Sequence, residues 1–410
     1  MSTIEQQALA YHALGQPGKI AIQVTKAVTN SADLALAYSP GVAAPCLAIQ
    51  ADPAKAYEYT AKGNLVAVIT NGTAVLGLGN IGALASKPVM EGKAVLFKKF
   101  AGVDAFDIEI DEADPEKLVE IIAALHPTFG GINLEDIKAP ECFYVERKLR
   151  ERLSIPVFHD DQHGTAIVVG AGLINAISLT GRDIADVKVV CSGAGAAAMA
   201  CLDMLVDIGV QRKNVVVCDS RGVITTARTL TPEKQLWAQD TIATTLSQVI
   251  EGADVFLGLS GPGLLTQDDV RTMAARPIIF ALANPEPELR PELIREVAPH
   301  AIIATGRSDY PNQINNALCF PYLFRAALDS AASTINQDMK RACVVALAGM
   351  AQSDSDFGVD YIVPNLLDPR LLTSVTPKIA TAAFDSGVAG RQLDETAYAE
   401  QLAALALTLI

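Results

Sequence analysis

The sequence predicts an α/β protein built of two domains, and three observations lead to this prediction. The chain has 410 residues, of which 50% are hydrophobic, so it can bury two ordinary cores. Strand-like and helix-like patterns alternate along its length. The second half also carries a glycine-rich turn between a strand and a helix. We therefore predict a mixed α/β domain over residues 1–155, followed by a Rossmann-like domain with a doubly wound parallel sheet over residues 156–410.

The first half contains three runs that are typical of strands. They are Leu65–Thr70, Ala105–Ile110 and Gly130–Ile137, the last of which finishes in the carboxylates Glu135 and Asp136. Helices are expected at Ala8–Lys19, from the cap Asp114 to about Leu125, and at Ala139–Leu153. We interpret Met90–Phe97 as a further apolar strand with Lys93 at its mouth. Burial there would lower the pKa of the lysine, but a surface lysine that extends its ammonium group to solvent is the commoner case.

An acidic segment, Pro156–Thr165, lies at the junction of the two halves. It contains Asp160 and Asp161 in a row, and we interpret it as a loop that suits a metal site. The apolar pattern that follows, from Ala166 to Leu179, predicts a buried helix that ends at Gly181.

The second half contains a complete dinucleotide-binding unit. The strand Val187–Cys191 is followed by a glycine turn, a helix to about Val206 and a second strand that ends at Asp219. Gly193 permits the turn and Gly195 lets backbone N–H groups approach a pyrophosphate. The residues predicted to bind the cofactor are Gly193, Ala194, Gly195, Ala196, Ala197, Ala198, Asp219, Ser220 and Arg221. Further strands are expected at Val255–Leu259, Ile278–Leu282 and Ile302–Thr305.

The nucleotide stays open between NAD and NADP. Asp219 can accept a hydrogen bond from a ribose 2′-hydroxyl, which favours NAD. Ser220 and Arg221, directly after it, can bind a 2′-phosphate, which favours NADP.

A second glycine pattern, Gly77–Gly82, has the G-x-G-x-x-G spacing but not the rest of the unit. An acidic residue is expected about 20 positions later, and Lys98 and Lys99 stand there instead. We interpret these glycines as a tight packing turn rather than a phosphate cradle.

Composition argues against several classes of partner. A formal net charge of −14 argues against nucleic acid and against an anionic membrane surface. The N-terminus lacks the basic and then apolar order of a secretion signal, and the longest apolar run, within residues 166–179, is too short for a membrane span. The seven cysteines are expected to be buried free thiols. These features predict a cytoplasmic protein without a membrane or nucleic-acid partner.

Seven motifs are spread over nearly the whole chain: Tyr38–Ala43, Gly77–Gly82, Glu91–Lys93, Asn133–Asp136, Phe158–Thr165, Ala281–Pro285 and Tyr310–Asn316. Together they resemble the malic enzymes, specifically the short bacterial type. The resemblance implies oxidative decarboxylation of (S)-malate to pyruvate and CO₂, with reduction of NAD or NADP and a requirement for Mg²⁺ or Mn²⁺. It also implies a homodimer or a larger homo-oligomer.

The resemblance assigns roles to individual residues. Lys93 is implied as the general base, Tyr38 as the general acid, and Asp160 as the residue that orients the lysine. The implied metal ligands are Glu135, Asp136 and Asp161, whose oxygens are the hard donors that Mg²⁺ and Mn²⁺ prefer. The implied substrate contacts are Lys93, Asn284 and Asn316.

The chain departs from the family pattern at one position. Long eukaryotic malic enzymes carry an arginine three residues before the G-L-G, where it holds a substrate carboxylate, and this chain has Ala74 there. Arg307 or Lys98 is the candidate replacement. Two alternative functions stay open: a malolactic enzyme that uses the same residues and retains NAD(H), and a non-catalytic dinucleotide-binding sensor.

Overall fold

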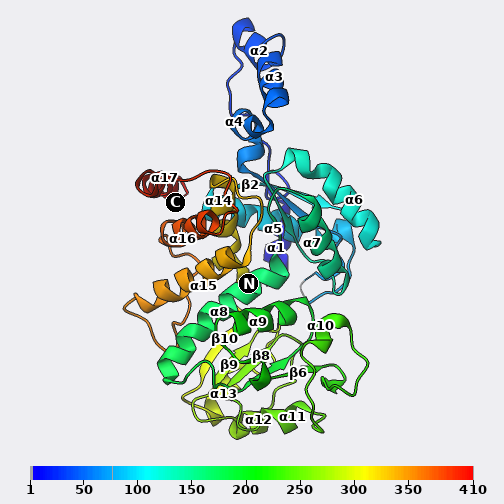
Figure 1. The fold of residues 1–410 in the computed structure, drawn as a ribbon, viewed down its shortest axis with the longest axis vertical. Coiled ribbons are helices and arrows are strands. Elements are labelled where there is room, and N and C mark those ends of the chain that lie inside the picture. The colour runs from blue at the N-terminus through cyan, green and yellow to red at the C-terminus, as the bar shows by residue number, and fades with distance from the viewer. Residues whose placement is uncertain (1–2, 76, 410) are drawn as a thin grey trace.

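The computed structural model describes residues 3–75 and 77–409 of the chain. Two mainly parallel sheets form the body, helices cover them, and a helical arm projects from one end (Figure 1). The predicted fold class is confirmed, since a mixed α/β unit precedes a Rossmann-like sheet.

The first sheet has four parallel strands in the order β2-β1-β3-β4. The strands are β1 (Leu65–Thr70), β2 (Asp104–Glu109), β3 (Gly131–Leu134) and β4 (Val157–His159). The register pairs Leu134 with His159, so the carboxyl ends of β3 and β4 lie at the same level. The predicted domain boundary between residues 155 and 156 therefore falls just before a strand of the first sheet.

Alternate residues of β1 contribute to two different cores. The helices around this sheet are α5 (Ala83–Ala101), α6 (Pro115–Leu125) and α7 (Glu141–Arg152). Leu65 and Ile69 belong to the core that contains the apolar faces of α6 and α7. Val66 and Val68 belong to the core that contains the buried face of α5. A strand that is covered on both faces needs this continuous apolar run.

Lys93 lies on a helix and not at the mouth of a strand. The buried residues Met90, Ala94, Phe97 and Ala101 of α5 recur every three or four positions, which is one face of an α-helix. The prediction of a strand at residues 90–97 is wrong, because a short apolar run does not by itself distinguish a strand from a buried helix.

The second sheet has six strands in the order β10-β9-β8-β5-β6-β7 and is parallel except for the short edge strand β7. The strands are β5 (Val189–Ser192), β6 (Val215–Asp219), β7 (Gly222–Val223), β8 (Val255–Gly258), β9 (Ile278–Ala281) and β10 (Ile302–Thr305). The strand order reverses between β5 and β8, which lie side by side. Open α/β sheets bind their ligands outside such a topological switch point.

Helices cover both faces of the second sheet. Val189 and Cys191 of β5 share a core with α9 (Ala196–Asp207), whereas Val190 faces the other core. The helices that contribute to this other core are α11 (Leu246–Ile250), α12 (Gln267–Thr272) and α13 (Pro291–Val297).

The long helix α8 (Asp160–Thr180) leads from the first sheet to the second. The predicted loop from Pro156 to Thr165 is wrong in its second half, because the helix begins at Asp160, directly after β4. Two carboxylates in the first turn suit a helix N-terminus, where backbone N–H groups carry partial positive charge. Within the described residues, α8 is the helix long and apolar enough to cross a membrane, but 67% of its most apolar window is buried inside the molecule, as in a core helix.

The last four helices return to the first unit. They are α14 (Phe320–Asp329), α15 (Gln337–Gln352), α16 (Leu371–Asp385) and α17 (Glu395–Thr408). The rings of Phe320 and Phe324 meet Phe97 of α5 edge to face, with centroids 4.7 and 5.3 Å apart. One apolar core therefore continues from the first sheet through α14 to the second sheet.

An arm of residues 20–52 projects from the body (Figure 1). It carries α2 (Ser31–Ala37) and α3 (Ala43–Ala51), neither of which has a buried residue. Its apolar side chains are exposed instead, Ile22 to 83% and Leu36 to 76%. The arm thus presents to solvent the kind of surface that the body buries.

The helix before the arm, α1 (Ile4–Ala13), also buries no residue. The predicted helix Ala8–Lys19 is wrong at both ends, because the helix starts earlier and Gly15 and Pro17 follow its end at Ala13.

Candidate active site

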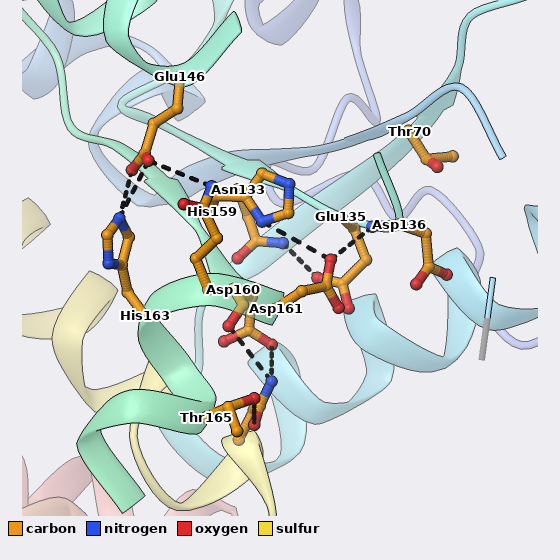
Figure 2. A network of polar contacts seen from close by, with 12 residues as sticks. Thr70, Asn133, Glu135, Asp136, Glu146, His159, Asp160, Asp161, His163 and Thr165 are labelled. Atoms are coloured by element: carbon orange, nitrogen blue, oxygen red, sulfur yellow. Dashed lines mark hydrogen bonds and ion pairs between the residues drawn. The ribbon is translucent and has the colours of Figure 1, made fainter. Parts of the chain in front are cut away.

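The carboxyl ends of β3 and β4 bring four carboxylates together. Glu135 and Asp136 follow β3, while Asp160 and Asp161 start α8 directly after β4 (Figure 2). The backbone N–H of Asp136 donates a 2.8 Å hydrogen bond to Oδ2 of Asp161. Carboxylate oxygens of Glu135, Asp136 and Asp161 lie within 4.8 Å of one another. The three predicted metal ligands therefore form one group.

Lys93 reaches this group from α5. Its Nζ lies 2.5 Å from Oδ2 of Asp160 and 2.8 Å from Oε1 of Glu135, and its side chain is 11% exposed. The ring of Phe320 lies below Nζ, with the centroid 4.3 Å away. The structure thus places the predicted base, its predicted orienting residue and one predicted metal ligand in direct contact.

Burial and charge act on Lys93 in opposite directions. Burial lowers the pKa of the amine, but the neighbouring carboxylates of Asp160 and Glu135 raise it, and their effect is the larger. Burial alone, as expected from the sequence, therefore does not decide the charge of this lysine. Without a further cation in the cluster, Lys93 is an ammonium group.

The cluster holds more negative charge than one lysine balances. Burial raises the pKa of Glu135 well above its ordinary value, Lys93 lowers it, and the neighbouring carboxylates raise it again. A group of three carboxylates with this surplus charge fits a hard divalent cation such as Mg²⁺ or Mn²⁺.

Asn316 is tied to the start of α8. Its Nδ2 donates to Oδ2 of Asp160 at 3.1 Å, and its Oδ1 accepts from the hydroxyl of Thr165 at 3.1 Å. The side chain of Asn316 therefore stands beside the residue that contacts Lys93, where a substrate contact is expected.

Asn284 follows β9 and is exposed. A Cβ placed on Gly77 would meet the carbonyl oxygen of Asn284 at 2.8 Å, and one placed on Gly306 would meet its Nδ2 at 3.0 Å. The Gly77–Gly82 turn of the first unit thus packs against the second unit beside Asn284, in agreement with its interpretation as a packing turn.

The glycine turn after β5 lies at the topological switch point. Gly193 has φ 124°, and a Cβ there would meet the carbonyl oxygen of Leu259, after β8, at 2.3 Å. Gly195 is the N-cap of α9, and a Cβ there would meet nothing within 4 Å. Open space at the start of a helix of 12 residues suits a pyrophosphate. The residues Ala194, Ala196, Ala197 and Ala198 complete this turn.

Asp219, at the end of β6, is held by two cations that the sequence did not indicate. Arg228 Nη2 lies 2.7 Å from Oδ2 of Asp219 and Lys234 Nζ lies 3.1 Å from it. Burial alone would raise the pKa of Asp219, but hydrogen bonds from Arg228, the Arg221 amide and Lys234 lower it to about 2. Ser220 and Arg221 are exposed beside it. Arg228 and Lys234 follow Asp219 by 9 and 15 positions, and no motif in the sequence indicates that they contact it.

Tyr38 does not join the carboxylate cluster in the single chain. It follows α2 in the arm and is 72% exposed. Figure 1 shows α2 far from α5 and α8, which carry Lys93 and Asp161. Its role as general acid stays a prediction.

The two candidate replacements for the missing arginine are both engaged elsewhere. Arg307 makes a bidentate pair with Asp309 and donates to the carbonyl oxygen of Pro285. Lys98 pairs with Asp104 at the amino end of β2, which is the opposite end of the sheet from the cluster. Arg307 is the nearer in the fold, because Pro285 directly follows Asn284.

Two side chains to which the sequence analysis gave no role stand behind the predicted metal ligands. Asn133 Nδ2 donates to Oε2 of Glu135 at 2.8 Å, and His159 Nδ1 lies 3.6 Å from Oδ2 of Asp161. Each precedes its carboxylate by two positions. That spacing is visible in the sequence, but it does not show which way the side chains point.

Comparisons with known proteins cover nearly the whole chain. The family model "Malic enzyme, N-terminal domain" matches residues 17–150, and "Malic enzyme, NAD binding domain" matches residues 162–386. The chain is 59% identical to an NADP-dependent malic enzyme of Escherichia coli (strain K12) and 56% identical to an NAD-dependent malic enzyme of Rhizobium meliloti (strain 1021), in both cases over 97% of this chain. A crystal structure of malic enzyme from Pyrococcus horikoshii Ot3 superimposes with a TM-score of 0.93 at 43% identity, covering 99% of this chain and 96% of that one.

The chain spans about half the length of the two curated relatives, 55% of the first and 54% of the second.

Proposed function

This chain belongs to the malic enzyme family, and on that premise we propose that it catalyses the divalent-metal-dependent oxidative decarboxylation of (S)-malate to pyruvate and CO₂, with reduction of NAD or NADP. The observation that carries the proposal is the contact of Lys93 with Glu135 and Asp160, beside a group of three carboxylates. A base next to a cation site is what the oxidation of a 2-hydroxy acid requires.

Lys93 takes the proton of the malate 2-hydroxyl in the proposed reaction. Its amine must first be neutral, and burial above Phe320 favours the neutral form once the charge of Glu135 is engaged elsewhere. Asp160 keeps Nζ in place through a 2.5 Å contact and is itself held by Asn316. Glu135, Asp136 and Asp161 would hold a divalent cation, which when bound would supply Lewis-acid polarisation of the substrate oxygens.

Other residues of the chain complete the reaction. The turn Gly193–Ala198 holds the nucleotide that serves as hydride acceptor. Asn284 and Asn316 contact malate, and Tyr38 delivers a proton to C3 after CO₂ has left.

One assay tests this function. The protein is mixed with malate, Mn²⁺ and either NAD or NADP, with EDTA in a parallel sample. Stoichiometric NAD(P)H and pyruvate, both lost with EDTA, are expected. Lactate without net reduced cofactor would indicate malolactic activity instead. Nucleotide binding without turnover would indicate a sensor.

We further propose that NADP is the preferred nucleotide. The two oxygens of Asp219 already accept hydrogen bonds from Arg228, Lys234 and the Arg221 amide, which leaves little acceptor capacity for a ribose hydroxyl. The neutralised carboxylate repels a 2′-phosphate less, and the exposed Arg221 side chain stands beside it.

The proposal predicts how Arg221→Ala changes nucleotide use. We expect kcat/KM for NADP to fall about tenfold or more while that for NAD changes little, since a charge-assisted hydrogen bond is lost only with NADP. Lys213→Ala, a change at another exposed cation, is the control. Equal losses with both nucleotides would remove Arg221 from the pocket, and wild-type preference for NAD would overturn the proposal.

We also propose that two copies of the chain exchange their arms, so that Tyr38 of one copy enters the site of the other. The support is that the arm buries none of its helical residues, exposes Ile22, Val24 and Leu36, and holds Tyr38 away from Lys93 of its own chain. Exposed apolar side chains gathered on one projecting segment are typical of an interaction site, and identical chains commonly form closed dimers.

Complementation between two inactive variants tests the exchange. Tyr38→Phe and Lys93→Ala chains are unfolded together and refolded as a mixture. In a hybrid dimer, one site combines Lys93 of the first chain with Tyr38 of the second, so about a quarter of the wild-type rate is expected in the mixture. No recovery, in a mixture that contains hybrid dimers by mass spectrometry, would contradict the exchange.

A further inference from the structure

His159 is a buried imidazole that faces the carboxylate cluster without a hydrogen bond. It is the last residue of β4 and is 0% exposed, and neither ring nitrogen has a protein partner within hydrogen-bond distance. Figure 2 shows Nδ1 turned toward Oδ2 of Asp161, 3.6 Å away. Leaving a buried polar group unpaired costs roughly 1–3 kcal/mol, so such a group calls for an explanation.

Asn133 stands in the same relation to Glu135 on the adjacent strand. It is also fully buried, and its Nδ2 donates a 2.8 Å hydrogen bond to Oε2 of Glu135. The register that pairs Leu134 with His159 puts the two arrangements side by side. Asn133 already makes a hydrogen bond to Glu135, whereas His159 lies just beyond hydrogen-bond distance of Asp161.

Asp161 has the greater need of support. Its side chain is 34% exposed, whereas that of Glu135 is 6% exposed and touches Lys93. A more exposed carboxylate has more rotamer freedom to lose when it binds a cation. A fixed donor behind it removes part of that cost before binding.

We propose that His159 is a positioning residue that donates its Nδ1–H to Asp161 and holds this carboxylate in the orientation that binds the divalent cation. The inference rests on the proposed function, because it takes Asp161 as a metal ligand. A neutral imidazole has one N–H, and Nδ1 is the nitrogen that faces Asp161. His159 acts through Asp161 and is not itself a ligand, since the group of oxygens within 4.8 Å consists of Glu135, Asp136 and Asp161.

The test is the affinity of the metal-free protein for Mn²⁺, measured from the EPR signal of free Mn²⁺ during a titration. His159→Leu removes the donor but fills the buried space, and His159→Asn keeps an N–H near the position of Nδ1. We expect His159→Leu to raise the Kd about 10- to 100-fold, the usual effect of losing a group that orients a ligand, while His159→Asn stays within about threefold of wild type.

A matched control separates this effect from a general disturbance of α8. His163 lies on the first turns of the same helix, but its Nε2 bonds to Glu146 at 2.8 Å and not to the cluster. His163→Gln keeps a donor for Glu146 and should bind Mn²⁺ like the wild type. The melting temperature of each metal-free variant shows whether the fold is kept, and a purely structural role would lower it without changing the Kd of the folded protein.

The possible outcomes are distinct. Equal Mn²⁺ affinity in wild type and His159→Leu would overturn the inference and leave the metal site standing. An equal loss in His159→Asn would overturn the donor role, and an equal loss in His163→Gln would replace it with a disturbed helix. A wild-type protein that binds no stoichiometric Mn²⁺ would overturn the proposed metal site and the inference together.

Discussion

The residues predicted to transfer protons have opposite surroundings in the body and in the arm. Lys93 is 11% exposed and is fixed by Asp160 and Glu135, whereas Tyr38 is 72% exposed at the end of a helix that buries nothing. Apolar packing holds the backbone of α5 on one side of the first sheet, and the arm has no comparable core. Packing of the backbone is what fixes the position of a side chain. Because the arm has no such packing within its own chain, we propose that a second copy of the chain supplies the surface against which the arm packs.

The largest effect on activity is expected from Lys93→Ala, which removes the proposed general base. Both malate oxidation and the reduction of oxaloacetate should fall by about two to four orders of magnitude, because both steps pass through the base. Lys99→Ala, on the exposed face of the same helix, is the control and should keep both rates. Retained oxaloacetate reduction in Lys93→Ala would assign the base to another residue.

Tyr38→Phe tests the proposed role of the arm residue Tyr38 as general acid. Overall turnover of malate to pyruvate should fall by about two orders of magnitude or more, whereas oxaloacetate reduction should persist, since it needs no proton at C3. Unchanged affinity for NAD(P)H shows that the second unit is intact. If Tyr38→Phe lost oxaloacetate reduction as fully as Lys93→Ala, the phenol would belong to the hydride step and the division of roles would be wrong.

Lys340 is a buried lysine of the body whose positive charge lowers the stability of the folded protein. The side chain is 5% exposed, and burial lowers its pKa to about 8 although Glu146 raises it. Below pH 8 the folded protein holds a buried ammonium group, and between pH 8 and the ordinary value of 10.5 the unfolded chain binds the proton that the folded one releases. This lysine therefore makes the protein more stable as pH rises through that window.

Lys340→Met should remove this dependence. At pH 7 we expect the variant to exceed the wild type in unfolding free energy by up to about 3 kcal/mol, since one pKa unit corresponds to about 1.4 kcal/mol. The difference should shrink between pH 8 and 10.5 in urea titrations. Lys378→Met, at an exposed lysine of α16, should show no such trend. A wild type that is the more stable at pH 7 would mean that Glu146 more than offsets burial.

The smallest effect is expected from the arm surface. Ile22→Ser should weaken association of two chains by about 2 kcal/mol, the value of burying one such side chain, and leave the stability of the body unchanged. Ile242→Ser, at a fully exposed position of the second unit, is the matched control. Analytical ultracentrifugation gives the dissociation constants. Equal constants for Ile22→Ser and wild type would remove this part of the arm from the interface.

Local chemistry in the sequence was enough for several features of this protein. The bounds of β1 and β10 coincide with the runs Leu65–Thr70 and Ile302–Thr305, because branched apolar residues bounded by turns signal a strand through their own properties. The unit of strand, glycine turn, helix and strand around Gly193 was equally predictable, since the positive φ of Gly193 meets a local backbone need. The group of Glu135, Asp136 and Asp161 was implied by the resemblance to a family and not by local chemistry, and the structure brings the three carboxylates together.

Other features were decided only in three dimensions. The helix that carries Lys93, its contacts with Glu135 and Asp160, the two cations on Asp219 and the imidazole behind Asp161 all depend on which strands are neighbours and in what register. Tyr38 shows the converse, because the fold of one chain leaves it outside the cluster. Patterns in a sequence report the preferences of neighbouring residues. The contacts of Lys93 with Glu135 and Asp160 join residues tens of positions apart. The contacts of Asp219 and Asp161 join nearer residues, but the directions of their side chains are determined only by the packing of the sheets and helices.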